Sequence, residues 1–196
     1  MADTSKRGLR SKTTFGFLDE TGFSDRPVVR YTWAKRGKTP LIRSAGGWKH
    51  RTAVGTILCR PNGSRPRLVF TVQKKAMRAR SFIRYLEKLK QYRRGRQLTL
   101  FLDGLPAHRA KVVCRWIEAN KHWLTVYRFP AYAPEYNPAE YVWSATKTKD
   151  HANRCPKNMD ALERRIRRGL KRVSEASILK GCLKASKLFN VIGEGQ

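Results

Sequence analysis

Residues 129–149 read FPAYAPEYNPAEYVWSATKTK and decide the fold, because a proline-rich loop passes there into a helix. The prolines exclude a helix through the first half of the stretch. Asn137 is a good N-cap, a proline follows at the first helical position, and Glu140 falls at the third. A continuing helix places Glu140, Trp143 and Lys147 on one side. A capping box with Asn137 would also explain Glu140, so a purely structural role stays open at this point.

Acidic residues are scarce elsewhere, and two of them follow apolar runs. The chain has 14 Asp plus Glu against 43 Lys plus Arg. Phe15–Leu18 leads into Asp19 and Leu98–Leu102 leads into Asp103, and both runs have the length and composition of strands. A carboxylate that ends a buried strand needs a partner, because an isolated buried charge is costly. Carboxylates from two strand ends and a helix start can share a pair of divalent metal ions.

The charge and the cysteines limit the class of protein. The net charge is +29 and is spread along the chain, which predicts a polyanionic partner, with nucleic acid favoured over an anionic membrane. The four cysteines form no CxxC pair, so neither a zinc site nor a disulfide framework is expected. They are predicted to be reduced, mostly buried thiols of a cytoplasmic protein. No apolar run approaches about 18 residues, so no membrane span or membrane partner is expected.

The remaining pattern predicts an α/β fold with a mixed five-stranded sheet flanked by helices. Further strands are expected at 49–59, 67–72, 97–103 and 124–129, and helices at 79–92, 110–119, from 138, from 158 and over 178–189. The order is an antiparallel meander followed by crossovers, and sites in such sheets form at strand ends beside the crossovers. We expect a flexible basic N-terminus (1–14), an α/β domain (15–155) and a basic helical extension (156–196). The last helices either pack on the domain with their basic side in solvent or form a second DNA-facing surface.

Basic and aromatic residues are candidates for DNA contacts. Trp33 lies among cations, which suits base stacking, although a core position is equally compatible. Residues 74–96 carry ten basic residues against Glu87 alone, whereas a merely solvated surface would mix the signs. His108 fits a loop hydrogen-bonding role better than a phosphate contact, and Trp143 suits the core as well as DNA. The full predicted DNA-binding set is Trp33, Arg36, Lys38, Arg80, Arg84, Lys88, Arg93, Arg94, His108, Trp143 and Lys147.

Four motifs carry a resemblance to a known family. In order, FLDETGFSDRP, VRYTWAKRGKTP, LFLDGLPAH and FPAYAPEYNPAEYVWSATKTK resemble the catalytic domain of bacterial transposases of the mariner-related insertion sequence 630 family. The likeness runs from about Phe15 to Val173. It implies an RNase H-like fold in which Asp19, Asp103 and Glu140 are catalytic and bind two Mg²⁺ ions, with Mn²⁺ able to substitute. The 36 residues between Asp103 and Glu140 are close to the spacing typical of the wider group.

The resemblance also implies an activity and partners. The expected reaction is hydrolytic cleavage of DNA at transposon ends, followed by transfer of the 3′-hydroxyl into target DNA. Gly104 replaces an Asn that the family often has, and only 18 residues precede Asp19, too few for the family's helix-turn-helix modules. A separately encoded helix-turn-helix subunit is therefore expected, and the joining of two ends favours a homodimer. An inactive remnant that binds nucleic acid by charge and an RNase H-like nuclease stay open as alternatives. Whether Glu20, which strand alternation sends to the opposite face from Asp19, takes part is also open.

Overall fold

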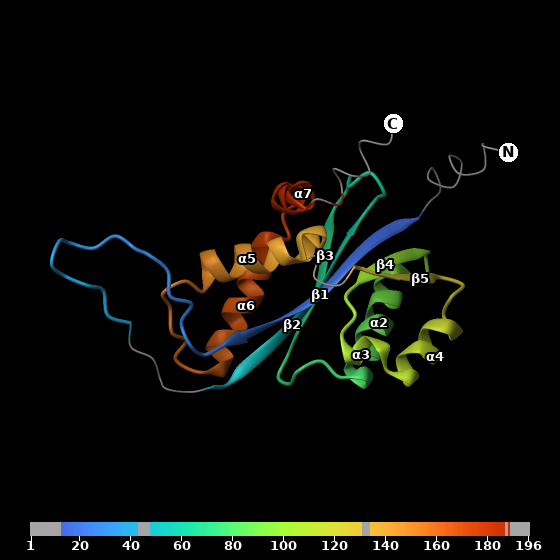
Figure 1. Cartoon of the computed structure of the whole chain (residues 1–196), viewed down its shortest axis with the longest axis horizontal. Coiled ribbons are helices and arrows are strands. Elements are labelled where there is room, and N and C mark those ends of the chain that lie inside the picture. Colours follow the sequence, from blue (N-terminus) through green and yellow to red (C-terminus); the bar gives the residue numbers. More distant parts are fainter. Residues whose placement is uncertain (1–12, 43–47, 131–133, 187, 189–196) are drawn as a thin grey trace.

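A computed structural model of the chain describes residues 13–42, 48–130, 134–186 and 188, and its centre is a five-stranded sheet (Figure 1). The strands are β1 (Thr14–Ser24), β2 (His50–Cys59), β3 (Arg67–Gln73), β4 (Leu98–Leu102) and β5 (Leu124–Arg128), in the spatial order β3-β2-β1-β4-β5. The β1–β2 and β2–β3 pairs are antiparallel, and the β1–β4 and β4–β5 pairs are parallel. The predicted mixed sheet, a meander followed by crossovers, is confirmed.

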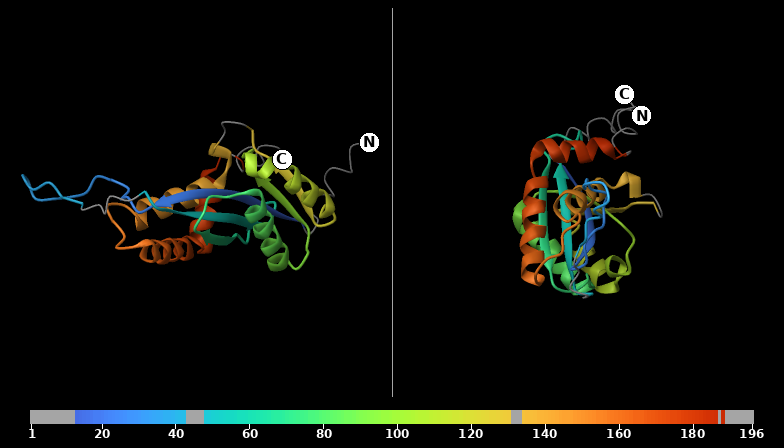
Figure 2. Two further views of the ribbon diagram at one scale, coloured as in Figure 1. Left: turned by 90° about the horizontal axis from the view of Figure 1, so that it is seen from below. Right: turned by 90° about the vertical axis from the view of Figure 1, so that its left-hand side faces the viewer.

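Helices cover both faces of the sheet (Figure 2). One face packs against α2 (Ala79–Arg93), the short α3 (Pro106–Arg109) and α4 (Lys111–Ala119). The other face packs against α5 (Pro138–Asp150), α6 (Met159–Val173) and α7 (Ala176–Ala185), and a 3-10 turn, η1 (Pro134–Tyr136), precedes α5. The segment DGLPAHRA, predicted to be a loop, contains α3, because Pro106 starts a single helical turn there.

Strand alternation in β1 divides its side chains between two apolar cores. Phe17 belongs to the core under α5 and α6, whereas Leu18 belongs to the core under α2. The same alternation turns Asp19 toward α5 and Glu20 toward α2 and α3. The opposite faces predicted for these two acids are therefore confirmed, and each face carries one carboxylate.

β1 is longer than predicted, and Asp19 does not end it. Pairing with β2 continues to Ser24, which lies opposite His50. The parallel pairing with β4 stops earlier, at the Phe17–Phe101 pair. Asp19 therefore lies inside a strand but just past the point where β1 and β4 separate, which still puts it at the carboxyl end of the parallel half of the sheet. The sequence pattern ended the strand too soon because the polar run after Leu18 lies beside a partner that only tertiary structure supplies.

The two C-terminal helices share the core under α5. The apolar side of α6 is buried at Leu162, Ile166, Leu170 and Val173. Asn158 caps the helix by accepting a hydrogen bond from the Ala161 amide at 2.8 Å. On α5, Asp150 accepts a 2.6 Å hydrogen bond from the Arg172 guanidinium, which ties α5 to α6. Part of the helix expected over 178–189 lies outside the described residues, and the described part is α7. The predicted boundary at residue 155 stays a prediction.

Residues 25–42 follow β1 without forming a helix or a strand of the sheet, and they project away from the body (blue in Figure 1). They are anchored near their start by a bridge between Val28 and Ala152. Trp33 lies on this segment and is fully exposed, so a core position for it is excluded. Of the four cysteines, Cys59 and Cys182 are buried and all four are free thiols. Among the described residues, no helix has both the length and the apolarity needed to cross a bilayer.

One glycine of β2 makes room for a large side chain. Gly55 stands directly opposite Asp19 in the β1–β2 register. A Cβ at Gly55 would lie 2.8 Å from Cη2 of Trp143, well inside van der Waals contact. The missing side chain therefore lets the indole lie against the sheet beside Asp19. An isolated glycine inside a strand often marks such a close approach.

We predict that Gly55→Ala destabilises the protein by about 1–3 kcal/mol, because the added methyl group overpacks the Trp143 site. At this chain length the melting temperature should fall by roughly 3–10 °C. The matched control is Gly22→Ala in β1, where an added Cβ meets no atom within 4 Å. Thermal denaturation of both variants checks the prediction, and equal melting temperatures for the two would contradict it.

Candidate active site

Three carboxylates come from three elements at one end of the parallel strands. Asp19 lies two residues beyond the last β1–β4 pair, and Asp103 lies two residues beyond the same pair on the other strand. Glu140 stands in the first turn of α5, which packs on β1. The charges of Glu140 and Asp103 both raise the pKa of Asp19, so the three groups interact electrostatically. The arrangement expected from the sequence motifs is compatible with this geometry, although the roles of the three residues stay a prediction.

Asp19 is the most deeply placed of the three, with 6% of its surface exposed. Its Oδ2 accepts a 2.9 Å hydrogen bond from the Trp143 indole Nε1. Burial raises the pKa of Asp19 from 3.8 to about 7, the Glu140 charge adds to the rise, and the bond from Trp143 opposes it. A nearby positive charge would stabilise the ionised form of this buried carboxylate.

The start of α5 is built as the sequence predicts. The Asn137 side chain accepts a 3.1 Å hydrogen bond from the Ala139 amide, with a proline at the first helical position. This leaves Glu140 exposed at the helix start. About two helical turns after Glu140, on the same side of α5, the half-buried Lys147 donates a 2.7 Å hydrogen bond to Thr21 Oγ1. Burial lowers the pKa of Lys147, while Glu140 and Asp19 act in the opposite direction, so this cation belongs to the same electrostatic site.

Asp103 is held by its own loop. Its Oδ1 accepts hydrogen bonds from the Leu105 amide at 3.2 Å and from His108 Nδ1 at 2.8 Å. Burial alone would raise the pKa of Asp103, but these two bonds outweigh it and keep the pKa below its ordinary value. Nε2 of His108 lies 3.5 Å from Glu20 Oε2. Glu20 is thus partly buried against a histidine, not solvated.

The donor set suits a hard divalent cation. Within the described residues, no three His, Cys, Asp and Glu side chains lie close enough together to hold a metal ion by themselves. Mg²⁺ typically takes one or two carboxylates and completes its coordination with water and substrate phosphates. The buried Asp19, raised in pKa by its acidic neighbours, is a carboxylate whose charge a cation would compensate. The residues therefore fit a hard divalent cation such as Mg²⁺ or Mn²⁺ that completes its coordination with water and phosphate oxygens.

Two residues of the predicted DNA-binding set are corrected by their burial. Trp143 is 2% exposed and His108 is 1% exposed, and the polar atoms of both rings face carboxylates. Neither ring can lie against DNA in this arrangement. Trp143 orients Asp19 from the core, and His108 has the hydrogen-bonding role in its loop that the sequence favoured.

The rest of the set lies in three places. Trp33, Arg36 and Lys38 are exposed on the projecting segment. On α2 and just after it, Arg80, Arg84, Lys88 and Arg94 are exposed, and the partly exposed Arg93 donates to the Gln97 carbonyl at 3.2 Å. Lys147 alone is beside the carboxylates. The structure thus separates these residues instead of gathering them, and their contacts with DNA stay a prediction.

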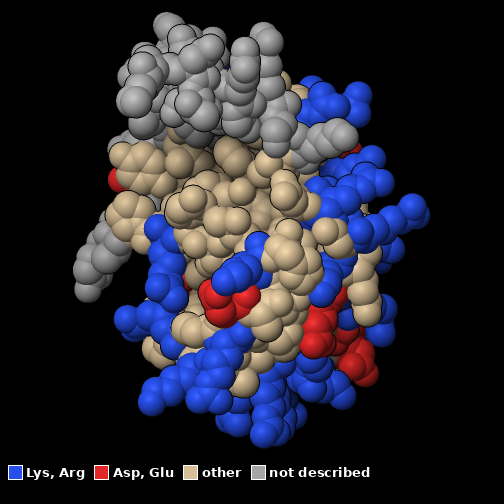
Figure 3. Space-filling model, turned by 90° about the vertical axis from the view of Figure 1, so that its right-hand side faces the viewer, with Lys and Arg blue, Asp and Glu red and all other residues tan. Residues whose placement is uncertain are grey.

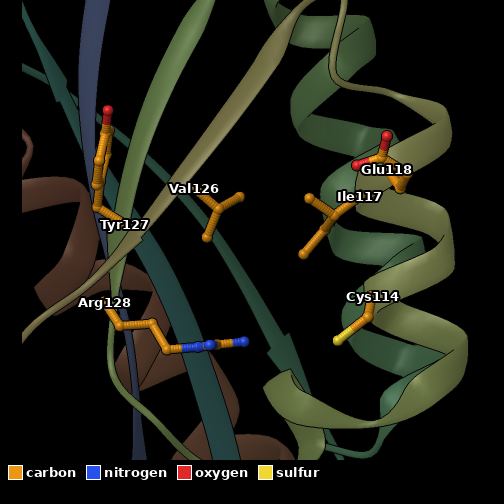
Figure 4. Close-up of a pocket in the computed structure, with 6 residues that line it drawn as sticks. All are labelled: Cys114, Ile117, Glu118, Val126, Tyr127 and Arg128. Carbon is orange, nitrogen blue, oxygen red and sulfur yellow. The ribbon is translucent and has the colours of Figure 1, made fainter.

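Lys and Arg dominate the charged surface at the end of the molecule that carries β4, β5 and α4 (Figure 3). Acidic residues form only a few small clusters on that face. A shallow groove of about 350 Å³ runs between α4 and β5, where Cys114, Ile117 and Glu118 face Val126 and Arg128 (Figure 4). Tyr127 points to the other side of the sheet. The groove is apart from Asp19 and Glu140, because those residues lie on the α5 face.

Sequence reasoning missed two contributors to the site. Gly55 was not singled out, although an isolated glycine in a strand is a signal of close approach. Thr21, which binds Lys147, offered no signal, because its role depends on α5 lying across β1. Both residues act from β1 or β2 on α5, and a sequence pattern does not specify that contact.

Comparisons with known proteins agree with this geometry. The profile of the DDE superfamily endonuclease family matches residues 14–163, which include all three carboxylates. A curated protein of Shigella sonnei, the insertion element IS630 uncharacterized 39 kDa protein, is 25% identical over 159 residues, covering 81% of this chain and 45% of that protein.

Solved structures share the fold. The Mos1 mariner paired end complex with Mn aligns with a TM-score of 0.66 at 17% identity over 98% of this chain, and the paired end complex with Mg aligns with a TM-score of 0.67 at 16% identity over 98%. Each alignment covers 59% of the Mos1 chain, so this chain spans about half to three fifths of the length of its relatives. The expected RNase H-like fold is confirmed by these alignments. Because the family profile covers most of the sequence, the chain belongs to the DDE superfamily endonuclease family.

Proposed function

We propose that this chain is the catalytic part of a DNA transposase that cleaves DNA at the ends of a mobile element and joins the freed 3′-hydroxyl to target DNA. The observation that carries the proposal is the electrostatic coupling of Asp19 to Glu140 and Asp103 at the carboxyl ends of β1 and β4. The similar proteins support it, since one is an insertion-element protein and others are Mos1 paired-end and strand transfer complexes. The Mos1 complexes with Mg and Mn support the same choice of metals.

In this proposal Asp19, Asp103 and Glu140 hold two divalent ions together with DNA phosphate oxygens. The bound metal would activate a water or a 3′-hydroxyl and stabilise the leaving oxygen. The protein's part is orientation. Trp143 fixes Asp19, the Leu105 amide fixes Asp103, and the N-terminal turn of α5 presents Glu140.

The chemistry is two successive displacements at phosphorus. In the first, a water oxygen forms a bond to the phosphorus at the element end, and the bond from phosphorus to the 3′ oxygen breaks, leaving a 3′-hydroxyl. In the second, that hydroxyl oxygen forms a bond to a target phosphorus and displaces the target 3′ oxygen. Each step exchanges one P–O bond for another, so strand transfer needs no external energy source.

The wider setting belongs to the same proposal. We propose a DNA partner comprising element ends and target, a separately encoded helix-turn-helix subunit, and a homodimer that brings two ends together. Because the proposed substrate is DNA, we propose that the working protein is cytoplasmic and associated with the nucleoid. We also propose the division into a basic N-terminal segment (1–14), a catalytic domain (15–155) and a basic helical extension (156–196). The basic α2 surface would supply phosphate contacts without sequence information.

Asp103→Asn tests the catalytic proposal. The substitution keeps the size of the side chain but removes its negative charge, so metal-dependent nicking of supercoiled plasmid should fall at least about 100-fold with either Mg²⁺ or Mn²⁺. The matched control is Asp160→Asn, an acid in the first turn of α6 that should leave nicking unchanged. Equal nicking by wild type and Asp103→Asn would contradict the assignment of Asp103 to the catalytic site. DNA binding without nicking by either protein would favour the charge-only remnant.

The product separates a transposase from a nuclease. A plasmid substrate carrying the element's own ends should give cuts at those ends and joined products with target DNA. An RNase H-like nuclease would cut without joining and would degrade RNA–DNA hybrids. Joined products are detected as a slower band on a denaturing gel.

Asp19→Asn tests the electrostatics of the site through stability. A carboxyl group whose pKa rises on folding destabilises the fold as the pH increases from about 4 through 7. A pKa near 7 in place of 3.8 corresponds to about 4 kcal/mol above pH 7. Asparagine can still accept the Trp143 bond and does not ionise. Without metal, the variant should therefore melt roughly 8–15 °C above wild type at pH 8, with the gap closing toward pH 4.

The same melting experiment reports on metal. Excess Mg²⁺ with DNA should raise the melting temperature of the wild type at pH 8 more than that of Asp19→Asn, because ligand binding to the folded state stabilises it. A melting temperature for Asp19→Asn equal to or below that of wild type in metal-free buffer would contradict the prediction. Asp160→Asn again provides the control.

The basic surface of α2 makes a separate prediction about salt. Replacing Arg80, Arg84 and Arg94 with Gln should reduce the slope of log affinity against log salt by about 2–3, because each phosphate contact contributes about 0.9. The matched variant replaces Arg164, Arg168 and Lys171, three exposed residues of α6. A smaller slope in the first variant alone would assign the DNA contacts to α2. A smaller slope in the second variant alone would assign them to α6 and contradict the assignment to α2.

A further inference from the structure

His108 stands between two carboxylates from different parts of the sheet. Nδ1 is 2.8 Å from Asp103 Oδ1, and Nε2 is 3.5 Å from Glu20 Oε2. Asp103 follows β4, and Glu20 belongs to β1, the neighbouring parallel strand. The imidazole therefore connects the loop that carries Asp103 to β1, the strand that carries Asp19 and Glu20.

The ring has little freedom to turn. His108 is 1% exposed, and the Phe82 ring of α2 packs against it with the ring centroids 4.2 Å apart. The backbone is fixed as well, because Pro106 starts the turn and the His108 amide donates to the Leu105 carbonyl at 2.9 Å. In this position the ring directs both of its nitrogens at carboxylates.

The two contacts of the ring differ in kind. Nδ1 of His108 makes a hydrogen bond with Asp103 Oδ1 at 2.8 Å. Nε2 of His108 and Oε2 of Glu20 lie 3.5 Å apart and are both buried, and neither atom has a hydrogen-bond partner among the described residues. The contact with Asp103 is therefore the one that can orient a carboxylate, and Glu20 faces the other side of the ring.

The contact also distinguishes the two oxygens of Asp103. Oδ1 accepts from the Leu105 amide and from His108. Within the described part of the chain, no hydrogen bond to Oδ2 is present, and this oxygen is the one left for a metal ion. Without the ring, the Asp103 carboxylate would be freer to rotate about its Cβ–Cγ bond, and Oδ1 and Oδ2 could exchange places.

Resting on the function proposed above, we propose that His108, whose second ring nitrogen faces Glu20, is a positioning residue that fixes the Asp103 carboxylate in the orientation that binds metal. The assignment concerns a residue outside the three carboxylates, and it gives Glu20 a role that strand alternation alone could not. Groups that orient a metal ligand typically change metal affinity or activity by about 10- to 100-fold when they are removed.

The test compares three variants of the full chain by Mn²⁺ binding, measured by electron paramagnetic resonance in the presence of DNA, and by nicking kinetics. His108→Ala should weaken Mn²⁺ binding and lower kcat by about 10- to 100-fold, with the KM for DNA little changed. His108→Asn should recover much of both, because its amide nitrogen lies near the place of Nδ1 and can donate to Asp103. Glu20→Gln should give an intermediate loss.

Controls separate positioning from folding. His122→Ala removes an exposed histidine in the turn after α4 and should match wild type in every measurement. Melting temperatures show which variants are folded. If His108→Ala does not fold, Glu20→Gln and His108→Asn decide the question, since both keep a polar group of similar size.

The outcomes also separate this inference from the proposed function. Wild-type Mn²⁺ affinity and kcat in folded His108→Ala, with Asp103→Asn inactive, would overturn the positioning role alone. A lower melting temperature with unchanged Mn²⁺ affinity would overturn it as well, because the ring would then be only structural. Equal nicking and Mn²⁺ binding by wild type and Asp103→Asn would instead overturn the proposed function, and the positioning role with it.

Discussion

The hydrogen bond from the Trp143 indole to the Asp19 carboxylate joins α5 to the centre of the sheet, and the rest of the site depends on it. Trp143 is buried in the core that α5, α6 and α7 share with one face of the sheet. Gly55 opposite Asp19 leaves the space for the indole. Because Glu140 lies one helical turn before Trp143, the same packing contact that buries the tryptophan brings the glutamate to the carboxyl ends of β1 and β4. The same contact of Trp143 with the sheet therefore packs the core and brings the site residues together.

The site carries an electrostatic cost that fits its proposed use. Asp19 is buried beside two other acids, which raises its pKa to about 7. Asp103 has the opposite environment, since His108 and a backbone amide hold its pKa down. Two carboxylates on neighbouring strands thus differ in their readiness to ionise. A divalent cation bound between them would remove the cost at Asp19, and marginal stability of this kind is common where function requires unpaired charge.

Most basic residues of the predicted DNA-binding set lie away from the three carboxylates. With 43 Lys plus Arg, an acidic cluster would be expected to form ion pairs with many of them. The described ion pairs of Asp103 and Glu20 are instead with His108, and Glu140 is exposed at a helix start. Lys147 is near the carboxylates but is held by Thr21. The basic residues of α2 lie on the opposite face of the sheet from α5, where they can contact phosphates without neutralising the site.

The sequence by itself determined the class of fold, the order of the strands and of the longer helices, and the N-cap at Asn137, and it singled out the three acidic positions as candidates. These follow from local physics: apolar periodicity, turn residues and capping are properties of short segments, and each was visible in its own stretch. The resemblance of four motifs to the insertion sequence 630 family pointed to the same three acids.

Only the tertiary structure decided where those residues meet. It showed that Asp19 lies inside a longer strand, because β2 continues beside β1 after β4 has separated from it. It turned Trp143 and His108 from predicted DNA contacts into buried groups that hold carboxylates, because burial depends on which helix covers which face. It also gave Gly55, Thr21 and Glu20 their roles. Each of these roles is a contact between residues distant in sequence, and such contacts arise only when the sheet and helices pack together.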